Sequence, residues 1–321
     1  MDAIVTAGGI PQPKDPLYTY ARGNSKALLD VAGKPMIQWV LDALGNAKNV
    51  DNVIIIGLSP KSGLTCRKPT YYISNQGRML SNIVTGVNKV LELTPEAEYT
   101  LIVSSDIPAV KSEQIDWLIE TCMQTHDDLY YGVCPQDVME TRFPNSRRTY
   151  TKLKDMQVCG ADMNITHVRM ATEHLDMWEN LIGNRKSPLK QASIIGFGTL
   201  FMLLTGQLTL NEAVERATKR IGITGRAIVW EHAEPCMDVD KPHQLEIMRE
   251  DLAKQVAEAA PVPVSKPRKA PVAKKAAAKP EAKAEKKEPV RVKSVRKPAV
   301  KTGKAKAAPK EKKVAVKPRK K

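Results

Sequence analysis

The chain has 321 residues, of which 42% are hydrophobic, and it carries a formal net charge of +15 at pH 7. Residues 261–321 hold 23 Lys and Arg against four Glu, a net charge of +19 that leaves about −4 for residues 1–260, so the basic balance gives no argument for a nucleic-acid-binding fold upstream. Five scattered cysteines with no CxxC pair argue against a disulfide framework or a thiolate zinc site and predict a reduced, cytoplasmic setting.

The first half of the chain alternates between predicted strands and helices. Unbroken apolar runs predict buried strands at Ala3–Ala7, Val53–Gly57 and Thr100–Ser104. Helical patterns separate them at Pro35–Leu44, Leu80–Leu91 and Ser112–Cys122. This alternation predicts an α/β fold, in three Rossmann-like layers with a mostly parallel central sheet.

The second half is less regular. Its predicted elements are a strand at Leu129–Cys134, a polar loop at Arg142–Tyr150, helices near Ala171–Ile182, Leu189–Leu204 and Leu210–Arg220, a strand at Ala227–Trp230 and a helix at Pro242–Ala259. The most apolar run, Ile194–Leu204, contains two glycines and is shorter than the roughly 20 residues that a bilayer span needs. It is therefore predicted as a buried core helix, and no signal peptide is expected before the first strand.

The chain is expected to divide into a folded domain, residues 1–259, and a C-terminal tail, residues 260–321. The tail is rich in Lys, Ala, Pro and Val and contains no aromatic residue, so it cannot bury enough apolar area to offset chain entropy and is predicted to be disordered. It resembles the tails of linker histones. Such a segment binds polyanions without base specificity. DNA, RNA, acidic membrane surfaces and polyphosphate stay open as partners, as does a spacer role without any partner.

A glycine pair follows the first strand. Without side chains, Gly8 and Gly9 let backbone amides approach an anion closely. Three cations follow, Lys14, Arg22 and Lys26. They are either solvated loop charges or groups that neutralise a triphosphate wrapped by the loop.

The segment Ala7-Gly8-Gly9, followed by Ser25-Lys26-Ala27-Leu28-Leu29 and Gly33-Lys34-Pro35-Met36, resembles the signature of the MobA-like nucleotidyltransferases. The resemblance implies the GT-A fold, an NTP substrate, Mg²⁺, and a phosphate-binding role for Lys26. Ser25 stands where Pro is usual, and the usual loop arginine is missing. Lys14 and Arg22 are both candidates to replace it.

Candidate metal-binding carboxylates come from two distant segments. Asp106 ends a buried strand, where ligands collect in open α/β sheets. The family resemblance implies a metal-binding aspartate there. The stretch Asp238-Val239-Asp240-Lys241-Pro242 resembles the closing motif of the family, which makes Asp240 the second ligand and Asp238 the alternate.

Two further regions are candidate substrate contacts. Gln76 and Gly77 lie where the family reads the nucleobase, although a capped turn explains them equally well. For an acceptor, the candidates are Arg147, Arg148, Gly160, Asp162 and Asn164. The two arginines can also be read as part of a solvated loop, and Lys186 and Lys190 are undecided.

Together these features predict an enzyme, a nucleotidyltransferase that moves a nucleoside monophosphate from an NTP to a phosphorylated small-molecule acceptor and releases pyrophosphate. Two alternatives stay open. One is an inactive nucleotide-binding domain tethered to nucleic acid by the tail. The other is a GT-A glycosyltransferase that uses Asp238-Val239-Asp240 as its Asp-x-Asp.

Overall fold

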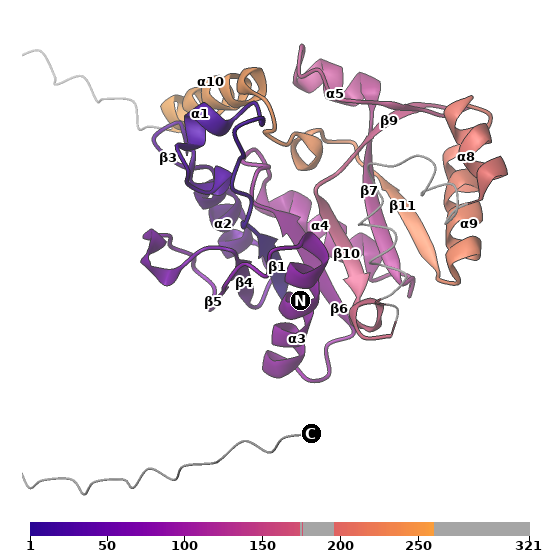
Figure 1. The fold of residues 1–321 in the computed structure, drawn as a ribbon, viewed down its shortest axis with the longest axis horizontal. Coiled ribbons are helices and arrows are strands. Elements are labelled where there is room, and N and C mark those ends of the chain that lie inside the picture. Colours follow the sequence, from indigo (N-terminus) through magenta and orange to yellow (C-terminus); the bar gives the residue numbers. More distant parts are fainter. Residues whose placement is uncertain (174, 176–195, 260–321) are drawn as a thin grey trace, which may run out of the picture. The chain divides into compact units, whose positions relative to one another are not determined.

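A twisted sheet of nine strands runs through the described part of the fold (Figure 1). The computed structural model describes residues 1–173, 175 and 196–259. These residues belong to one compact unit, Met1–Pro263. The tail, residues 260–321, lies outside the described residues, so the predicted domain boundary stays a prediction.

The strands of the large sheet are β1 (Ala3–Thr6), β4 (Val53–Ile56), β5 (Thr70–Ile73), β6 (Tyr99–Ser104), β7 (Leu129–Pro135), β8 (Thr151–Lys152), β9 (Gln157–Gly160), β10 (Met163–His167) and β11 (Gly225–Val229). They lie in the order β5-β4-β1-β6-β10-β7-β9-β8, and β11 also pairs with β7. A separate hairpin consists of β2 (Asp30–Val31) and β3 (Lys34–Pro35). The α-helices described are α1 (Tyr18–Ala21), α2 (Met36–Asn46), α3 (Met79–Leu93), α4 (Ser112–Cys122), α5 (Gln136–Arg142), α8 (Phe197–Leu204), α9 (Leu210–Ile221) and α10 (Pro242–Ala259). Single 3₁₀ turns include η1 (Lys26–Leu28), η3 (Val168–Ala171) and η4 (Glu234–Cys236).

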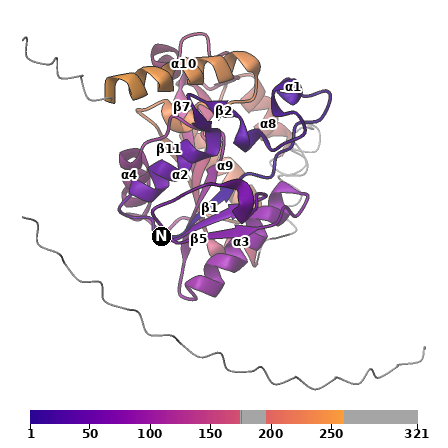
Figure 2. The ribbon, with the colours of Figure 1, turned by 90° about the vertical axis from the view of Figure 1, so that its left-hand side faces the viewer.

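The parallel part of the sheet is built around β1, which pairs in parallel with β4 on one side and β6 on the other. Alternate residues of β1 enter different cores. Val5 packs into the cluster that holds Leu41 of α2 and Leu118 of α4, whereas Ile4 packs with Val87 of α3. Helices therefore cover both faces of the sheet (Figures 1 and 2), and the predicted three-layer α/β fold is confirmed.

The second half adds mostly antiparallel strands to this parallel core. β10 runs antiparallel to both β6 and β7, and β9 runs antiparallel to β7. The polar stretch predicted to bind the acceptor covers the end of β9 and the start of β10. The sheet therefore brings Asp162, between those strands, to the same edge as the end of β6, and Ser104 donates its backbone N–H to the carbonyl oxygen of Asp162 (2.8 Å).

One predicted helix differs from the structure. The run Ile194–Leu204 was predicted as a buried core helix, but α8 begins only at Phe197 and none of its residues is buried. Gly196, with φ of +93°, precedes it in a conformation that a helix does not adopt. The predicted helix near residues 171–182, and residues 189–195 of the next one, lie wholly or largely outside the described residues. Among the helices that are described, none has the length and apolar character needed to cross a membrane.

Candidate functional site

The carboxyl ends of β1 and β6 define the candidate site. These two strands are parallel neighbours with Thr6 opposite Ser104, so the segments that follow them, Gly8–Gly9 and Asp106, emerge at the same edge of the sheet. The glycine loop also packs tightly against Gly57, the residue that follows β4. A Cβ on Gly57, whose φ is +101°, would lie 2.2 Å from the Cα of Gly8. The end of β4 therefore supports the loop by direct backbone contact.

Ser25 fixes Lys26 against this loop. The Ser25 hydroxyl donates a 2.7 Å hydrogen bond to the carbonyl oxygen of Ala7 and accepts one from the backbone N–H of Ala27 (3.2 Å). The backbone N–H of Lys26 in turn donates to the carbonyl oxygen of Gly9 (2.9 Å). Ser25, an unusual residue in the sequence motif, thus acts as the N-cap of η1 and ties the lysine to the end of β1.

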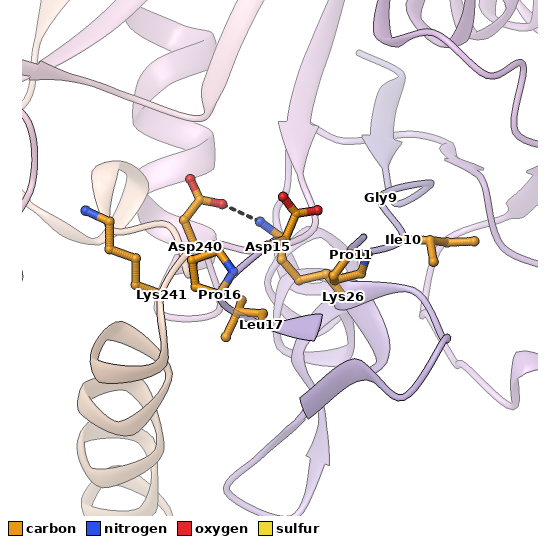
Figure 3. Close-up of a pocket in the computed structure, with 9 residues that line it drawn as sticks. All are labelled: Gly9, Ile10, Pro11, Asp15, Pro16, Leu17, Lys26, Asp240 and Lys241. Atoms are coloured by element: carbon orange, nitrogen blue, oxygen red, sulfur yellow. Dashed lines mark hydrogen bonds and ion pairs between the residues drawn. The ribbon is translucent and has the colours of Figure 1, made fainter. Parts of the chain in front are cut away.

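The Lys26 ammonium lies between two carboxylates. Its Nζ is 2.5 Å from Oδ2 of Asp106. It is also 2.6 Å from Oδ1 of Asp240, and Figure 3 shows this second contact. Burial lowers the pKa of Lys26, but the two carboxylates outweigh that effect and hold the pKa above its usual value. Burial likewise opposes ionisation of Asp240, and the Lys26 ammonium overcomes it, so the pKa of Asp240 is lowered. Lys26 and Asp240 are therefore both charged at neutral pH.

The segment before α10 is locked onto the end of β6. The backbone N–H of Val239 donates to the carbonyl oxygen of Asp106 (3.0 Å). The Gln244 side chain accepts hydrogen bonds from the backbone N–H groups of Asp240 and Lys241, both at 2.9 Å, and so satisfies the start of the helix. The backbone of both carboxylate segments is thereby fixed.

Two cavities meet at Lys26 and Asp240. One, of about 490 Å³, lies along the outer side of the glycine loop; Figure 3 shows its lining residues, Gly9, Ile10, Pro11, Asp15, Pro16, Leu17, Lys26, Asp240 and Lys241. The other has a volume of about 380 Å³ and is lined by Thr6, Gly8, Gly9, Lys26, Ala27, Asn75, Gly77, Arg78, Met79, Asn82, Ser104, Ser105, Asp106, Asp162, Asp238 and Asp240. The second cavity thus brings together eight of the residues that the sequence singled out.

Asn75 organises the loop that faces the glycine pair. Its Nδ2 donates to the carbonyl oxygen of Gly8 (3.0 Å), and its Oδ1 accepts from the backbone N–H of Gly77 (2.9 Å) and from Nδ2 of Asn82 (3.1 Å). The predicted base contact, Gln76, instead donates from its side chain to the carbonyl oxygen of Ser74 and does not line the cavity. The sequence signal for this role of Asn75 is its position two residues before Gly77, because an Asn side chain often accepts the backbone N–H two residues on in a turn.

Arg148 holds the acidic side of the second cavity. It forms an ion pair with Asp238, donates from Nη2 to the carbonyl oxygen of Gly160 (3.1 Å) and lies 3.8 Å from Oδ2 of Asp162. Burial, together with the nearby carboxylate of Asp106, raises the pKa of Asp162 to about 7, although Arg148 opposes the shift. Arg148 therefore pairs with carboxylates of the site and is not a solvated surface charge.

The other predicted site residues lie outside the two cavities. Lys14, Arg22 and Arg147 are exposed and line neither of them. Asn164 accepts the backbone N–H of Gly132 (2.9 Å) and joins two strands of the sheet. The arginine that does line the second cavity is Arg78, at the N-cap of α3. Arg78 directly follows Gln76 and Gly77, which the sequence did single out, but no local pattern shows which side chain of that loop lines the cavity.

The carboxylates present fit a divalent cation that also binds phosphate. Among the described residues, no three His, Cys, Asp or Glu side chains are arranged to hold a metal ion by themselves. However, Oδ1 of Asp106 is buried without a hydrogen-bond partner. The Lys26 ammonium contacts the carboxylates of both Asp106 and Asp240, so the two acidic side chains converge on one point. Two carboxylates completed by phosphate oxygens and water are what Mg²⁺ prefers.

Comparison with known proteins is consistent with this geometry. Residues 17–189 match the family model of the MobA-like NTP transferase domain. A hypothetical transferase from Thermus thermophilus is 29% identical, with a TM-score of 0.67 over 76% of this chain and 98% of that one. CMP:2-keto-3-deoxy-manno-octonic acid synthetase, solved in complex with CTP, is 14% identical, with a TM-score of 0.50 over 79% of this chain and 98% of that one, and so shares the fold. No curated protein matches the sequence.

Proposed function

Because this chain belongs to the MobA-like NTP transferase domain family, we propose that it transfers a nucleoside monophosphate from an NTP to an acceptor and releases pyrophosphate. The observation that carries the proposal is the Lys26 ammonium, which lies within 2.6 Å of carboxylates from both Asp106 and Asp240 where two cavities meet. A fixed cation beside two carboxylates is a site for a polyphosphate and its metal ion.

In this proposal, Asp106 and Asp240 hold Mg²⁺. Asp106 is suited to this role because its buried Oδ1 has no hydrogen-bond partner. Asp240 is suited because its carboxylate contacts the same Lys26 ammonium as Asp106 does. Asp238 is the less suitable ligand because Arg148 already pairs with it. When bound, the magnesium ion would neutralise charge on the phosphate oxygens.

The glycine loop and Lys26 bind the phosphates. Gly8 and Gly9 expose backbone to the second cavity, and the Lys26 ammonium stays protonated while charge develops on the leaving group. Arg78, on the rim of the same cavity, takes the part proposed from sequence for Lys14 or Arg22. Asn75 shapes the loop that faces the base, and Gly77 leaves room for it.

The acceptor is proposed to be a phosphorylated small molecule at the Asp162 end of the second cavity. Its phosphate oxygen forms a bond to the α-phosphorus of the NTP, and the bond from that phosphorus to the bridging oxygen breaks. Pyrophosphate leaves with the electron pair of that bond, so no side-chain nucleophile takes part. Of the predicted acceptor residues, Arg148 pairs with Asp162 and donates a hydrogen bond to Gly160. Arg147 and Asn164 line neither cavity.

Nucleotidyl transfer is favoured over the glycosyltransferase alternative by the pairing of Asp238. An Asp-x-Asp motif offers both of its carboxylates to a metal, but here Arg148 occupies the first of them. The inactive nucleotide-binding alternative predicts the same binding without turnover.

The folded domain is proposed to comprise residues 1–259, with the basic segment that follows as a disordered tail that contacts polyanions.

The test is nucleotide-dependent thermal stabilisation of the full chain. ATP, GTP, CTP and UTP are added separately, with and without Mg²⁺, to the wild type and to Asp106→Asn. At about 100 times its Kd, the preferred nucleotide should stabilise the wild type by roughly 2.7 kcal/mol, and only with Mg²⁺. Stabilisation by no nucleotide, or an equal response in Asp106→Asn, would refute the proposed site. Pyrophosphate release with a panel of phosphorylated acceptors then separates the transferase from the inactive binding domain.

A further inference from the structure

A groove of about 400 Å³ lies between α9 and the strands β7, β9 and β11. Figure 1 shows α9 beside β11. Most of the described side chains that line the groove are aliphatic, among them Leu153, Val158, Leu210, Val214, Ile221 and Ile223. Of the described residues, none lines both this groove and a cavity at Lys26. The groove is therefore a separate apolar site.

The groove and the second cavity open on the same face of the sheet. Successive residues of an extended chain point to opposite faces. Tyr131 and Gly160 line the groove. Ala161 and Met163, on either side of Asp162, are both buried in the core cluster on the other face. Asp162 therefore points to the face of the groove, where it lines the second cavity.

Close contacts join the groove to Asp162. A Cβ on Gly160 would lie 2.3 Å from the hydroxyl oxygen of Tyr131, so this hydroxyl lies directly over the backbone of Gly160. Arg148 donates from Nη2 to the carbonyl oxygen of Gly160 (3.1 Å) and lies 3.8 Å from Oδ2 of Asp162. Two residues of chain span at most about 7 Å, so the groove ends beside the part of the second cavity proposed for the acceptor.

The lining of the groove favours a hydrocarbon as its occupant. Two of its polar side chains already have partners. Arg226 donates from Nε to Oδ2 of Asp127 (3.0 Å), and Thr218 donates to the carbonyl oxygen of Val214 (2.9 Å). A sugar or polyol would lose the hydration of its hydroxyl groups in the groove and would gain few partners. An aliphatic chain gains free energy with each methylene that is buried.

We propose that the acceptor is the phosphate monoester of an aliphatic alcohol, with its phosphate at the Asp162 end of the second cavity and its hydrocarbon chain in the groove. This acceptor class rests on the proposed nucleotidyl transfer. A phosphate oxygen of the monoester forms a bond to the α-phosphorus of the NTP, and pyrophosphate leaves with the electron pair of the bond that breaks. The product is a nucleoside diphosphate that carries the aliphatic alcohol as an ester on its terminal phosphate.

The test compares phosphate monoesters of increasing chain length. Ethyl, butyl and octyl phosphate, each below its micellar concentration, are titrated into the full chain, and calorimetry measures their binding without turnover. Each methylene that enters the groove should tighten binding about fourfold. With the preferred NTP and Mg²⁺, kcat/KM for pyrophosphate release should rise with chain length in the same order.

A variant that fills the groove locates the chain. Ala217 of α9 lines the groove, so Ala217→Phe should reduce the gain in affinity from ethyl to octyl phosphate at least tenfold and leave ethyl phosphate binding almost unchanged. Ala253→Phe, at an exposed position of α10 that does not line the groove, makes the same change elsewhere and should keep the full gain. Unchanged nucleotide-dependent melting verifies that both variants are folded.

Three outcomes would overturn the acceptor class. Equal affinity of the wild type for ethyl and octyl phosphate would mean that no chain is buried. An unchanged gain in Ala217→Phe would mean that the chain binds outside the groove. Pyrophosphate release with glucose 1-phosphate but not with bound octyl phosphate would assign the site to a polar acceptor. A failure of the proposed nucleotidyl transfer is distinguishable from these, because pyrophosphate would then be released with no acceptor, whatever the chain-length dependence of binding.

Discussion

The backbone N–H of Val239 donates a 3.0 Å hydrogen bond to the carbonyl oxygen of Asp106, and this contact joins the two segments that supply the carboxylates of the site. Because the contact is made by backbone atoms, it sets the distance between the segments whatever their side chains bind. Lys26 then fits between Asp106 and Asp240 as a cation between two fixed anions.

Replacing Lys26 should slow the proposed reaction far more than replacing Lys14, the other lysine that follows the glycine pair. Lys26→Gln should lower the rate of pyrophosphate release by roughly a hundredfold or more, because a preorganised cation at the developing charge is lost. Lys14→Gln removes an exposed lysine that lines neither cavity, and it should change the rate less than twofold. Equal losses in the two variants would contradict the assignment of Lys26.

The same substitution should change the response to metal without nucleotide. In the free protein the Lys26 ammonium forms ion pairs with the carboxylates of both Asp106 and Asp240. Mg²⁺ alone should therefore raise the melting temperature of Lys26→Gln but leave that of the wild type almost unchanged. A titration with MgCl₂ in a thermal-shift assay measures this. If the two proteins respond equally, the carboxylates are not the shared site of lysine and metal.

Arg148 and Asp238 should be coupled in stability. Arg148→Gln leaves a buried carboxylate without its partner and should lower the free energy of unfolding by about 3 kcal/mol. In the double variant Arg148→Gln/Asp238→Asn no uncompensated charge stays buried, so part of this loss should be recovered. Urea unfolding of the four proteins gives the coupling energy. Additive effects would show that the two side chains do not depend on each other.

Gly57 should be essential to the glycine loop. Gly57→Ala puts a Cβ 2.2 Å from the Cα of Gly8 at a φ of +101°, so backbone has to move, and we expect a loss of at least about 3 kcal/mol. Gly63→Ala is the matched control. Its φ is +71° and nothing lies within 4 Å of the new Cβ, so the loss should be about 1 kcal/mol. Weaker NTP binding in Gly57→Ala alone would link the defect to the site.

Asn75, and not its neighbour, should determine nucleotide affinity. Asn75→Ala removes the hydrogen bonds to Gly8, Gly77 and Asn82 and should raise KM for the NTP about tenfold while kcat changes little. Gln76→Ala should leave both constants within twofold, since the Gln76 side chain donates to the carbonyl oxygen of Ser74 and does not line the second cavity. The reverse ranking would restore Gln76 as the base contact.

Acid stability should depend on Asp128. Burial opposes its ionisation, but hydrogen bonds from Thr224 and Arg169 prevail and hold the pKa of Asp128 below its usual value. A lowered pKa contributes stability at pH values above about 3.9, the unfolded pKa, and this contribution is lost as the pH falls through the folded pKa. Urea unfolding between pH 6 and pH 3 should show a shallower decline for Asp128→Asn than for the wild type. Parallel curves would contradict this.

The sequence predicted the parallel half of the fold well because its signals are local. The helices Ser112–Cys122 and Pro242–Ala259 have the predicted bounds, and the strands at β1, β4 and β6 differ from prediction by one residue. Each of these elements has a continuous apolar pattern or a clear start residue. The antiparallel strands β9 and β10 are short and polar in part, and long-range pairing makes them strands, so no local pattern revealed them.

The candidate site divides in the same way. Lys26, Asp106 and Asp240 were selected from motifs, and the structure places them together. The pairing of Arg148 with Asp238 was not foreseen, because it depends on a loop and a distant segment that meet only in the folded sheet. Arg78 was missed although its neighbours Gln76 and Gly77 were selected, because the sequence does not show which side chain of that loop lines the cavity.

The hydrogen bond between Val239 and Asp106 also has a consequence for synthesis on the ribosome. Strands β1, β4 and β6, the glycine loop and Lys26 all leave the ribosome before the segment that carries Asp240 is made. A nascent chain that stops short of that segment holds the strands of the parallel sheet, yet it lacks one of the two carboxylates and the backbone contact between Val239 and Asp106. Only α10 is made after Asp240, so a translation product truncated before Asp240 lacks both α10 and the second carboxylate that the proposed reaction requires.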